Sequence, residues 1–158
     1  MGWGLISFGL VATLGALLLA AGIEDARTRE ISNRKTAAIA LLAPVFWWVS
    51  GLAMWPGIAV QLGIAALVFA LFVGAFALGQ MGGGDVKLIG ALALWLPFAQ
   101  LAWALIVMAL IGGAITALFL VERWWRHRDA RAIEIPYGVA IAIAGLIQLR
   151  EPILNQIT

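Results

Sequence analysis

Long apolar runs separated by short charged segments dominate the chain. The runs cover residues 5–23, 36–54, 57–78, 86–121 and 135–149. A hydrocarbon core about 30 Å thick needs roughly 20 helical residues, so runs of this kind predict membrane-spanning helices. The period-two alternation typical of barrel strands is missing throughout the sequence. The pattern therefore predicts an all-α, polytopic membrane protein rather than a β-barrel.

The fourth run is too long for one crossing and contains a helix breaker. Its 36 residues include Leu96-Pro97, and a residue before proline is disfavoured in helix. We expect a short element over 86–96 and a longer one over 97–121, which makes about six crossings in all. Eleven residues cover only about 16 Å of helix. Such a short element at membrane depth is tolerated only inside protein or beside a wet cavity, so it gives the first indication of a site.

Composition supports a membrane protein and excludes several classes of protein. Of the 158 residues, 64% are hydrophobic and only 11% are charged, and a small soluble domain cannot bury that much apolar surface. A soluble enzyme, a disordered regulator and a coiled coil are therefore excluded. The chain has no cysteine, which rules out disulfides, cysteine-bound zinc and a thiol nucleophile. We expect residues 1–158 to form a single integral-membrane domain.

Charge placement predicts the orientation in the membrane. Nine of the ten basic residues lie in three segments: four between 27 and 35, Lys87 alone, and four between 123 and 131. Six crossings with an external N-terminus put all nine on the cytoplasmic side, as the positive-inside rule requires. The positive charge thus indicates topology and contact with lipid rather than a nucleic-acid partner. In this arrangement Trp3, Trp55 and Trp95 are expected outer-interface anchors, and Trp124, Trp125 and Tyr137 inner ones.

Two acidic residues lie at predicted cytoplasmic ends of membrane elements. Asp25 follows the first run, and Asp85 opens the short fourth element. Two carboxyl groups in a low-dielectric cleft do not both ionise easily, so one holds a proton while the other stays charged. The charged one activates water and the protonated one donates to a carbonyl, which is the chemistry of aspartic peptide hydrolysis. The sequence predicts equal depth for these two residues, but not contact between them.

The segments around Asp25 and Asp85 also have a simpler structural interpretation. The acids near Asp25 would pair with Arg27 and Arg29 in a solvated loop. Asp85 would be an N-cap, and the preceding glycines a turn. Three successive glycines beside a truncated element instead favour backbone exposed to an extended peptide. Glu24 adds an ambiguity, because neighbouring helical residues point about 100° apart and only one can face the partner acid.

Other catalytic mechanisms lack residues that they require. His127 is the only histidine and lies in a basic loop, so neither a histidine triad nor a metal cluster is complete. Ser32 and Lys35 would make a serine–lysine pair, but their loop is charged and offers no apolar pocket. We therefore expect no metal and no cofactor.

At this point the sequence resembles a known family, the type IV prepilin peptidases. Asp25, Arg27, Ile31 and Asn33 match the family's first aspartate motif, Asp-x-Arg-x-x-x-Ile-x-Asn, with Ser32 where many members have proline. The segment 82–87 matches the second, Gly-x-Gly-Asp-x-Lys, the source of the name GxGD protease. The segment 135–138 resembles a Pro-Tyr-Gly element that begins the final helix. Motif order and six-span topology agree over nearly the whole chain.

The resemblance implies an aspartic endopeptidase of the bacterial inner membrane, with Asp25 and Asp85 as its catalytic pair. The supporting positions that it implies are Gly82, Gly83, Gly84, Lys87, Arg27, Asn33, Pro136, Tyr137 and Gly138. The implied substrate is a prepilin or pseudopilin whose short basic leader is removed at the cytoplasmic face. Lys87 would contact an acidic residue early in the mature pilin.

Larger family members also methylate the new N-terminus and carry a soluble insertion with cysteine pairs. This chain has neither the insertion nor a cysteine, so the resemblance implies a peptidase-only short form like those of Flp/Tad pili. Two alternatives stay open. One is a GxGD protease with another membrane substrate, and the other is a proton-coupled carrier, although the sequence shows no internal repeat.

Overall fold

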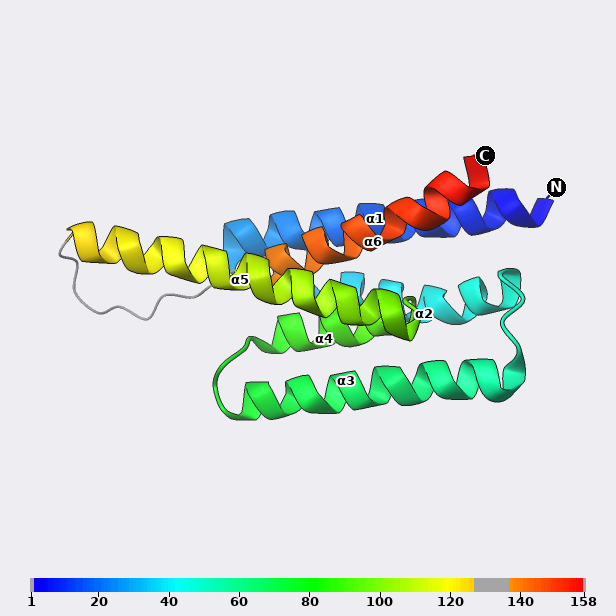
Figure 1. Ribbon diagram of the computed structural model, residues 1–158, viewed down its shortest axis with the longest axis horizontal. Coiled ribbons are helices and arrows are strands. Elements are labelled where there is room, and N and C mark those ends of the chain that lie inside the picture. Colours follow the sequence, from blue (N-terminus) through cyan, green and yellow to red (C-terminus); the bar gives the residue numbers. More distant parts are fainter. Residues whose placement is uncertain (1, 127–136, 158) are drawn as a thin grey trace.

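All the regular secondary structure in the described part of the chain is helical, as predicted. The computed structural model describes residues 2–126 and 137–157. Its elements are α1 (Gly2–Thr28), α2 (Asn33–Val49), the π-helical segment η1 (Met54–Ile58), α3 (Ala59–Ala77), α4 (Gly83–Ala93), α5 (Phe98–Arg126) and α6 (Tyr137–Ile157). The helices run along the long axis of the molecule (Figure 1). The molecule is an all-α membrane protein.

Helix length supports the predicted crossings. Three helical stretches in the described residues are long and apolar enough to cross a membrane: Gly4–Thr28, Met54–Ala77 and Phe98–Glu122. The 17 residues of α2 reach about 25 Å, and α6 contains the shorter apolar stretch Tyr137–Leu149. The fourth element is short, as expected, with 11 residues in α4. The helical structure is interrupted just before Pro97, between α4 and α5, as the sequence predicted.

Several boundaries differ from the prediction by a few residues, and two of them have a local cause. Helix α2 ends at Val49 rather than at residue 54, because Ser50 caps it and Gly51 follows with a φ of 71°. Glycine adopts this left-handed conformation without a Cβ clash, which is a common helix stop. Helix α4 begins at Gly83 with Gly82 as its N-cap. The interpretation of Asp85 as the N-cap was therefore wrong, because Asp85 lies within the first turn.

The short helix α4 occupies the interior of the bundle. It packs against α2, α3 and α6, while α1 pairs with α6, and α6 also pairs with α5. Eight of its eleven residues are buried, including Leu88, Ile89 and Leu92. A helix too short to cross the hydrocarbon core is thus enclosed by protein, which is the environment that its length requires.

The C-terminal end of α4 lies inside the protein, and side chains from other helices satisfy its carbonyl groups. The Trp47 indole N–H donates to the carbonyl oxygen of Leu94 at 2.8 Å. The Gln61 side-chain amide donates to the carbonyl oxygens of Ala93 and Leu96, both at 2.8 Å. The last carbonyl groups of a helix lack intrahelical partners, and unpaired they would cost several kcal/mol in hydrocarbon. These donors allow α4 to end at this depth.

Trp95 is a core residue, which corrects the expectation of an interface anchor. Its side chain is 5% exposed and stacks on Phe46 with ring centroids 5.0 Å apart. Its indole N–H donates to the carbonyl oxygen of Ile39 at 2.9 Å. Trp55, Trp124 and Trp125 are exposed, as anchors require. The side chain of Trp3 lies outside the described residues.

Replacing Gln61 tests how α4 is terminated. Gln61→Leu leaves two buried carbonyl groups without their donor, and we expect the free energy of unfolding to fall by about 1–3 kcal/mol. Denaturant unfolding of the purified protein in bicelles measures this change. Gln80→Leu is the matched control, because the Gln80 side chain is exposed and makes no hydrogen bond to the described residues. An equal loss in both variants would contradict the proposed role of Gln61.

Candidate functional site

Three helix ends meet at one end of the bundle. The C-terminal end of α1 lies there with the N-terminal ends of α4 and α6 (Figure 1). Asp25, near the end of α1, is 4% exposed, and Asp85, in the first turn of α4, is 7% exposed. Buried carboxyl groups are rare and need partners. The fold therefore brings together the two acids that the sequence could place only at equal depth.

A cavity of about 350 Å³ contains both acids. Its lining comes from the end of α1, the α1–α2 loop and the start of α4. The residues are Asp25, Arg29, Glu30, Ile31, Asn33, Gly82, Gly83, Gly84, Asp85 and Lys87. Seven of these ten were predicted site residues.

The first turn of α6 holds the carboxyl group of Asp25. The backbone N–H of Val139 donates to Oδ2 of Asp25 at 3.2 Å. The backbone N–H of Gly138 faces both Asp25 and Asp85, and the two carboxyl groups interact electrostatically. Free N–H groups at the start of a helix favour negative charge. These N–H groups thus favour negative charge at the two neighbouring acids.

The carboxyl group of Asp85 is less fully hydrogen-bonded than that of Asp25. Its carboxyl group faces the backbone N–H of Gly82, as in a capping box. Its Oδ1 atom is buried and has no hydrogen-bond partner among the described residues. A buried, unpaired carboxyl oxygen is costly and is uncommon in native proteins outside functional sites. This oxygen is therefore the atom of the site most available to a further donor.

The structure separates the neighbouring acids Glu24 and Asp25. Oε2 of Glu24 accepts the backbone N–H of Ser32 at 2.9 Å and the ammonium group of Lys35 at 2.8 Å. Glu24 thus braces the α1–α2 loop, while Asp25 lines the cavity. The expected pairing of this segment's acids with Arg27 and Arg29 was wrong for Glu24, because the loop folds back and presents Lys35 instead.

Two glycines permit the close approach of the three helix ends. A Cβ on Gly84 would lie 3.2 Å from Cβ of Ile31. A Cβ on Gly138 would lie 2.8 Å from Cγ of Asp25 and 2.6 Å from Cδ1 of Ile31. Side chains at these positions would push the α1–α2 loop and Asp25 away from α4 and α6. Close packing against Ile31 therefore explains why a glycine occupies position 84, which the sequence did not indicate. The exposure of the glycine backbone to a bound peptide stays a prediction.

Other predicted residues are distributed around the cavity. The Lys87 ammonium group donates to Oδ1 of Asn33 at 2.9 Å, joining α4 to α2. Tyr137 is half-buried against Gly112. Arg27 is exposed and does not line the cavity. Pro136 and His127 lie outside the described residues.

Arg29 and Glu30 line the cavity although the sequence did not single them out as site residues. Arg29 has a φ of 58° and ends α1, and its guanidinium lies 5.9 Å from the centre of the Phe119 ring. A left-handed conformation is uncommon for arginine, and no sequence pattern predicted it. This local turn directs residues 29–31 toward the cavity instead of along the axis of α1.

The serine–lysine alternative does not form. The Ser32 hydroxyl accepts the backbone N–H of Arg34 at 3.3 Å as the N-cap of α2, and Lys35 pairs with Glu24. Within the described ranges, no three acidic or histidine side chains gather as metal ligands would. Hydrolytic chemistry at this cavity thus has two carboxyl groups to draw on.

Comparison with known proteins identifies similarity to one family. The model of the type IV leader peptidase family matches residues 12–119, the greater part of the chain. The matched region contains both Asp25 and Asp85 and ends before Tyr137. No curated protein and no solved structure shows a significant match.

A methyl group at Gly138 tests the close packing of the site. We expect Gly138→Ala to lower the free energy of unfolding by about 1–3 kcal/mol, because the new Cβ overpacks Asp25 and Ile31. The control is Gly113→Ala in α5, where a Cβ meets nothing within 4 Å. There the gain in helix propensity stabilises by about 0.5–1 kcal/mol. Unfolding in bicelles measures both changes, and equal signs would contradict the packing argument.

Proposed function

This chain belongs to the type IV leader peptidase family, and we propose that it is an aspartic endopeptidase with Asp25 and Asp85 as its catalytic pair. One observation carries the proposal. Two buried carboxyl groups from separate helices share a cavity and the N–H of Gly138. Family membership makes the chain a leader peptidase, and this arrangement supports the assignment of its chemistry to these two residues.

The proposed reaction is the addition of water to a peptide carbonyl. The ionised carboxylate takes a proton from water, whose oxygen forms a bond to the carbonyl carbon. The protonated carboxyl group donates its proton to the carbonyl oxygen. The tetrahedral intermediate collapses as the C–N bond breaks. The amine nitrogen receives a proton from the acid that deprotonated the water, and one hydroxyl group of the intermediate returns its proton to the other aspartate as the carbonyl re-forms. The hydrogen bond from Val139 to Asp25 and the unpaired Oδ1 of Asp85 favour Asp25 as the ionised member.

The proposed substrate is the short basic leader of a prepilin or pseudopilin. Asp25, Glu30 and Asp85 give the cavity acidic groups that would attract a basic peptide, although Arg29 and Lys87 line the same cavity and offset part of this charge. The neighbouring Glu24 adds little to this charge, because it pairs with Lys35. The absence of cysteine and of a soluble insertion supports a peptidase-only form of the Flp/Tad type.

The basic segments support a cleavage site at the cytoplasmic face of the bacterial inner membrane. Lys87 and the basic residues of the α1–α2 loop lie at the same end of the bundle as the cavity. The positive-inside rule places that end in the cytoplasm and the N-terminus in the periplasm.

Amide substitutions of Asp25, Asp85 and Glu24 test the proposed catalytic pair. We expect Asp25→Asn and Asp85→Asn each to reduce leader removal by about 10²-fold or more, because an amide neither accepts nor supplies the required proton. Co-expression with a prepilin and separation of precursor from mature product measures the rate.

Glu24→Gln is the matched control from the adjacent position. The amide oxygen still accepts the Ser32 N–H, so we expect leader removal to persist even though the ion pair with Lys35 is lost. Unfolding curves establish that each variant is folded. Processing by folded Asp85→Asn at the wild-type rate would refute the catalytic pair.

A further inference from the structure

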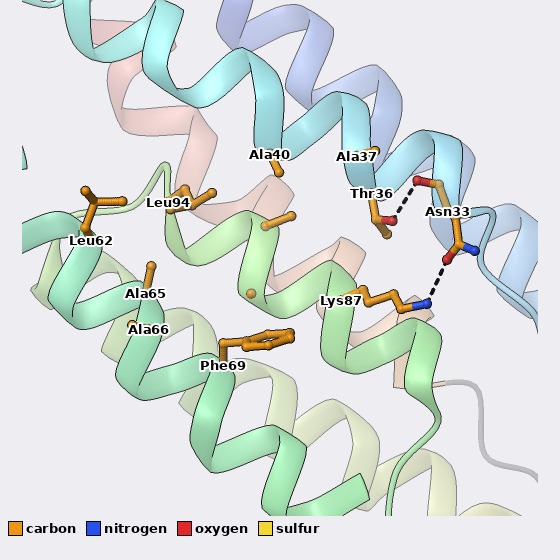
Figure 2. A pocket seen from close by; sticks show the side chains of 12 residues that line it. Asn33, Thr36, Ala37, Ala40, Leu62, Ala65, Ala66, Phe69, Lys87 and Leu94 are labelled. Atoms are coloured by element: carbon orange, nitrogen blue, oxygen red, sulfur yellow. Dashed lines mark hydrogen bonds between the residues drawn. The ribbon is translucent and has the colours of Figure 1, made fainter.

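A second, larger depression lies between α2 and α3, with α4 as its floor. This groove has a volume of about 590 Å³ and an almost entirely apolar lining (Figure 2). Half of its twelve lining residues are alanine or glycine, namely Ala37, Ala40, Ala65, Ala66, Gly90 and Ala91. In membranes, faces of small residues allow another helix to approach closely. The groove therefore has the surface chemistry of a helix-packing site.

The groove opens toward the bilayer. Leu62 and Phe69 on its α3 side are 47% and 43% exposed, and they belong to the candidate span Met54–Ala77. Both α2 and α3 pack on α4, so the width of α4 separates them along the groove. A helix that moves laterally in lipid would reach this groove without crossing water.

The groove and the aspartate cavity are neighbours that share two lining residues. Asn33 and Lys87 line both of them, and their side chains are joined by the hydrogen bond of 2.9 Å that Figure 2 shows. Lys87 is two residues after Asp85, so the end of the groove lies within one helical turn of a proposed catalytic carboxyl group. A chain lying in the groove would extend directly into the cavity.

Charge at this junction indicates which end of an occupant lies there. The described residues offer Lys87 the neutral amide of Asn33 and no carboxylate within ion-pair distance. Negative side chains are favoured in the first turn of a helix, where N–H groups are free. The ammonium group therefore complements a docked helix whose N-terminal turn carries an acid.

From these observations, and on the basis of the proposed function, we propose that the groove between α2, α3 and α4 binds the apolar transmembrane helix of the peptide substrate. The N-terminal turn of that helix lies at Asn33 and Lys87. The extended segment before it enters the cavity between Asp25 and Asp85. The groove would then select substrates by the presence of a membrane helix next to the cleaved bond.

Cross-linking tests docking without requiring catalysis. The chain has no native cysteine, so Ala66→Cys and Leu67→Cys each introduce a unique thiol in an Asp85→Asn background. Ala66 lines the groove, whereas Leu67 is 71% exposed outside it. The two positions share one depth but point about 100° apart. The probe is a peptide with a basic leader, a glycine and a 20-residue apolar helix carrying single cysteines over one turn.

We expect a bismaleimide to link the peptide to Ala66→Cys at least about fivefold more than to Leu67→Cys, with a period of one helical turn along the peptide. Equal linking at both positions, or none at either, would overturn the docking proposal. This outcome does not depend on whether the protein cleaves the peptide.

Cleavage kinetics separate docking from catalysis. Ala66→Trp fills the groove, and Leu67→Trp is the control at the same depth. For the membrane-anchored peptide, we expect Ala66→Trp to raise KM at least about tenfold with little change in kcat. For a short soluble peptide that spans only the cleaved bond, both variants should match wild type. Equal effects on the two peptides would refute docking, whereas wild-type protein that cuts neither would refute the proposed function.

Discussion

Hydrocarbon offers no hydrogen bonds to a peptide backbone, and this constraint governs how α4 is built into the protein. Its 11 residues are too few to cross the bilayer, so both ends need partners inside the molecule. Trp47 and Gln61 supply donors to the carbonyl groups at one end. At the other end, Gly82 and Asp85 lie beside α1 and α6. The packing of the remaining helices follows from the need to enclose this element.

The same constraint explains why the two carboxyl groups are buried. The first turn of α4 lies next to the first turn of α6, and the end of α1 completes the group. A Cβ at Gly138 would clash with Asp25 and Ile31, and one at Gly84 would crowd Ile31. Backbone N–H groups of Gly138 and Val139 then compensate part of the desolvation of the acids. Stability and site geometry therefore depend on the same contacts, and changes at either glycine should affect both.

Shortening one helix also creates space. Because α4 lies between α2 and α3, it leaves a groove along one side and a polar cavity at its N-terminal end. Lys87 and Asn33, which are hydrogen-bonded to each other, line both spaces. A peptidase acting next to a membrane helix has to hold an apolar segment in lipid while admitting water to the neighbouring bond. A truncated helix with one polar end combines these two environments within a single fold.

The sequence alone predicted the all-helical class, the short fourth element and its break before Pro97, because run lengths and proline act locally. It also placed Asp25 and Asp85 at corresponding helix ends. It mispredicted the end of α2, the role of Trp95 and the partner of Glu24. Helix α2 ends at the local left-handed turn of Gly51, whereas the role of Trp95 and the partner of Glu24 depend on contacts that form only when the chain folds.

The left-handed turn at Arg29 and the contact of Ile31 with Gly84 and Gly138 likewise left no pattern in the sequence. The sequence determined which residues enter the membrane and which of them carry charge, because solvation acts on each side chain separately. The motif match favoured Asp25 over Glu24, but only the tertiary structure decided that Asp25 shares a cavity with Asp85. That outcome depends on how three helix ends pack together in space.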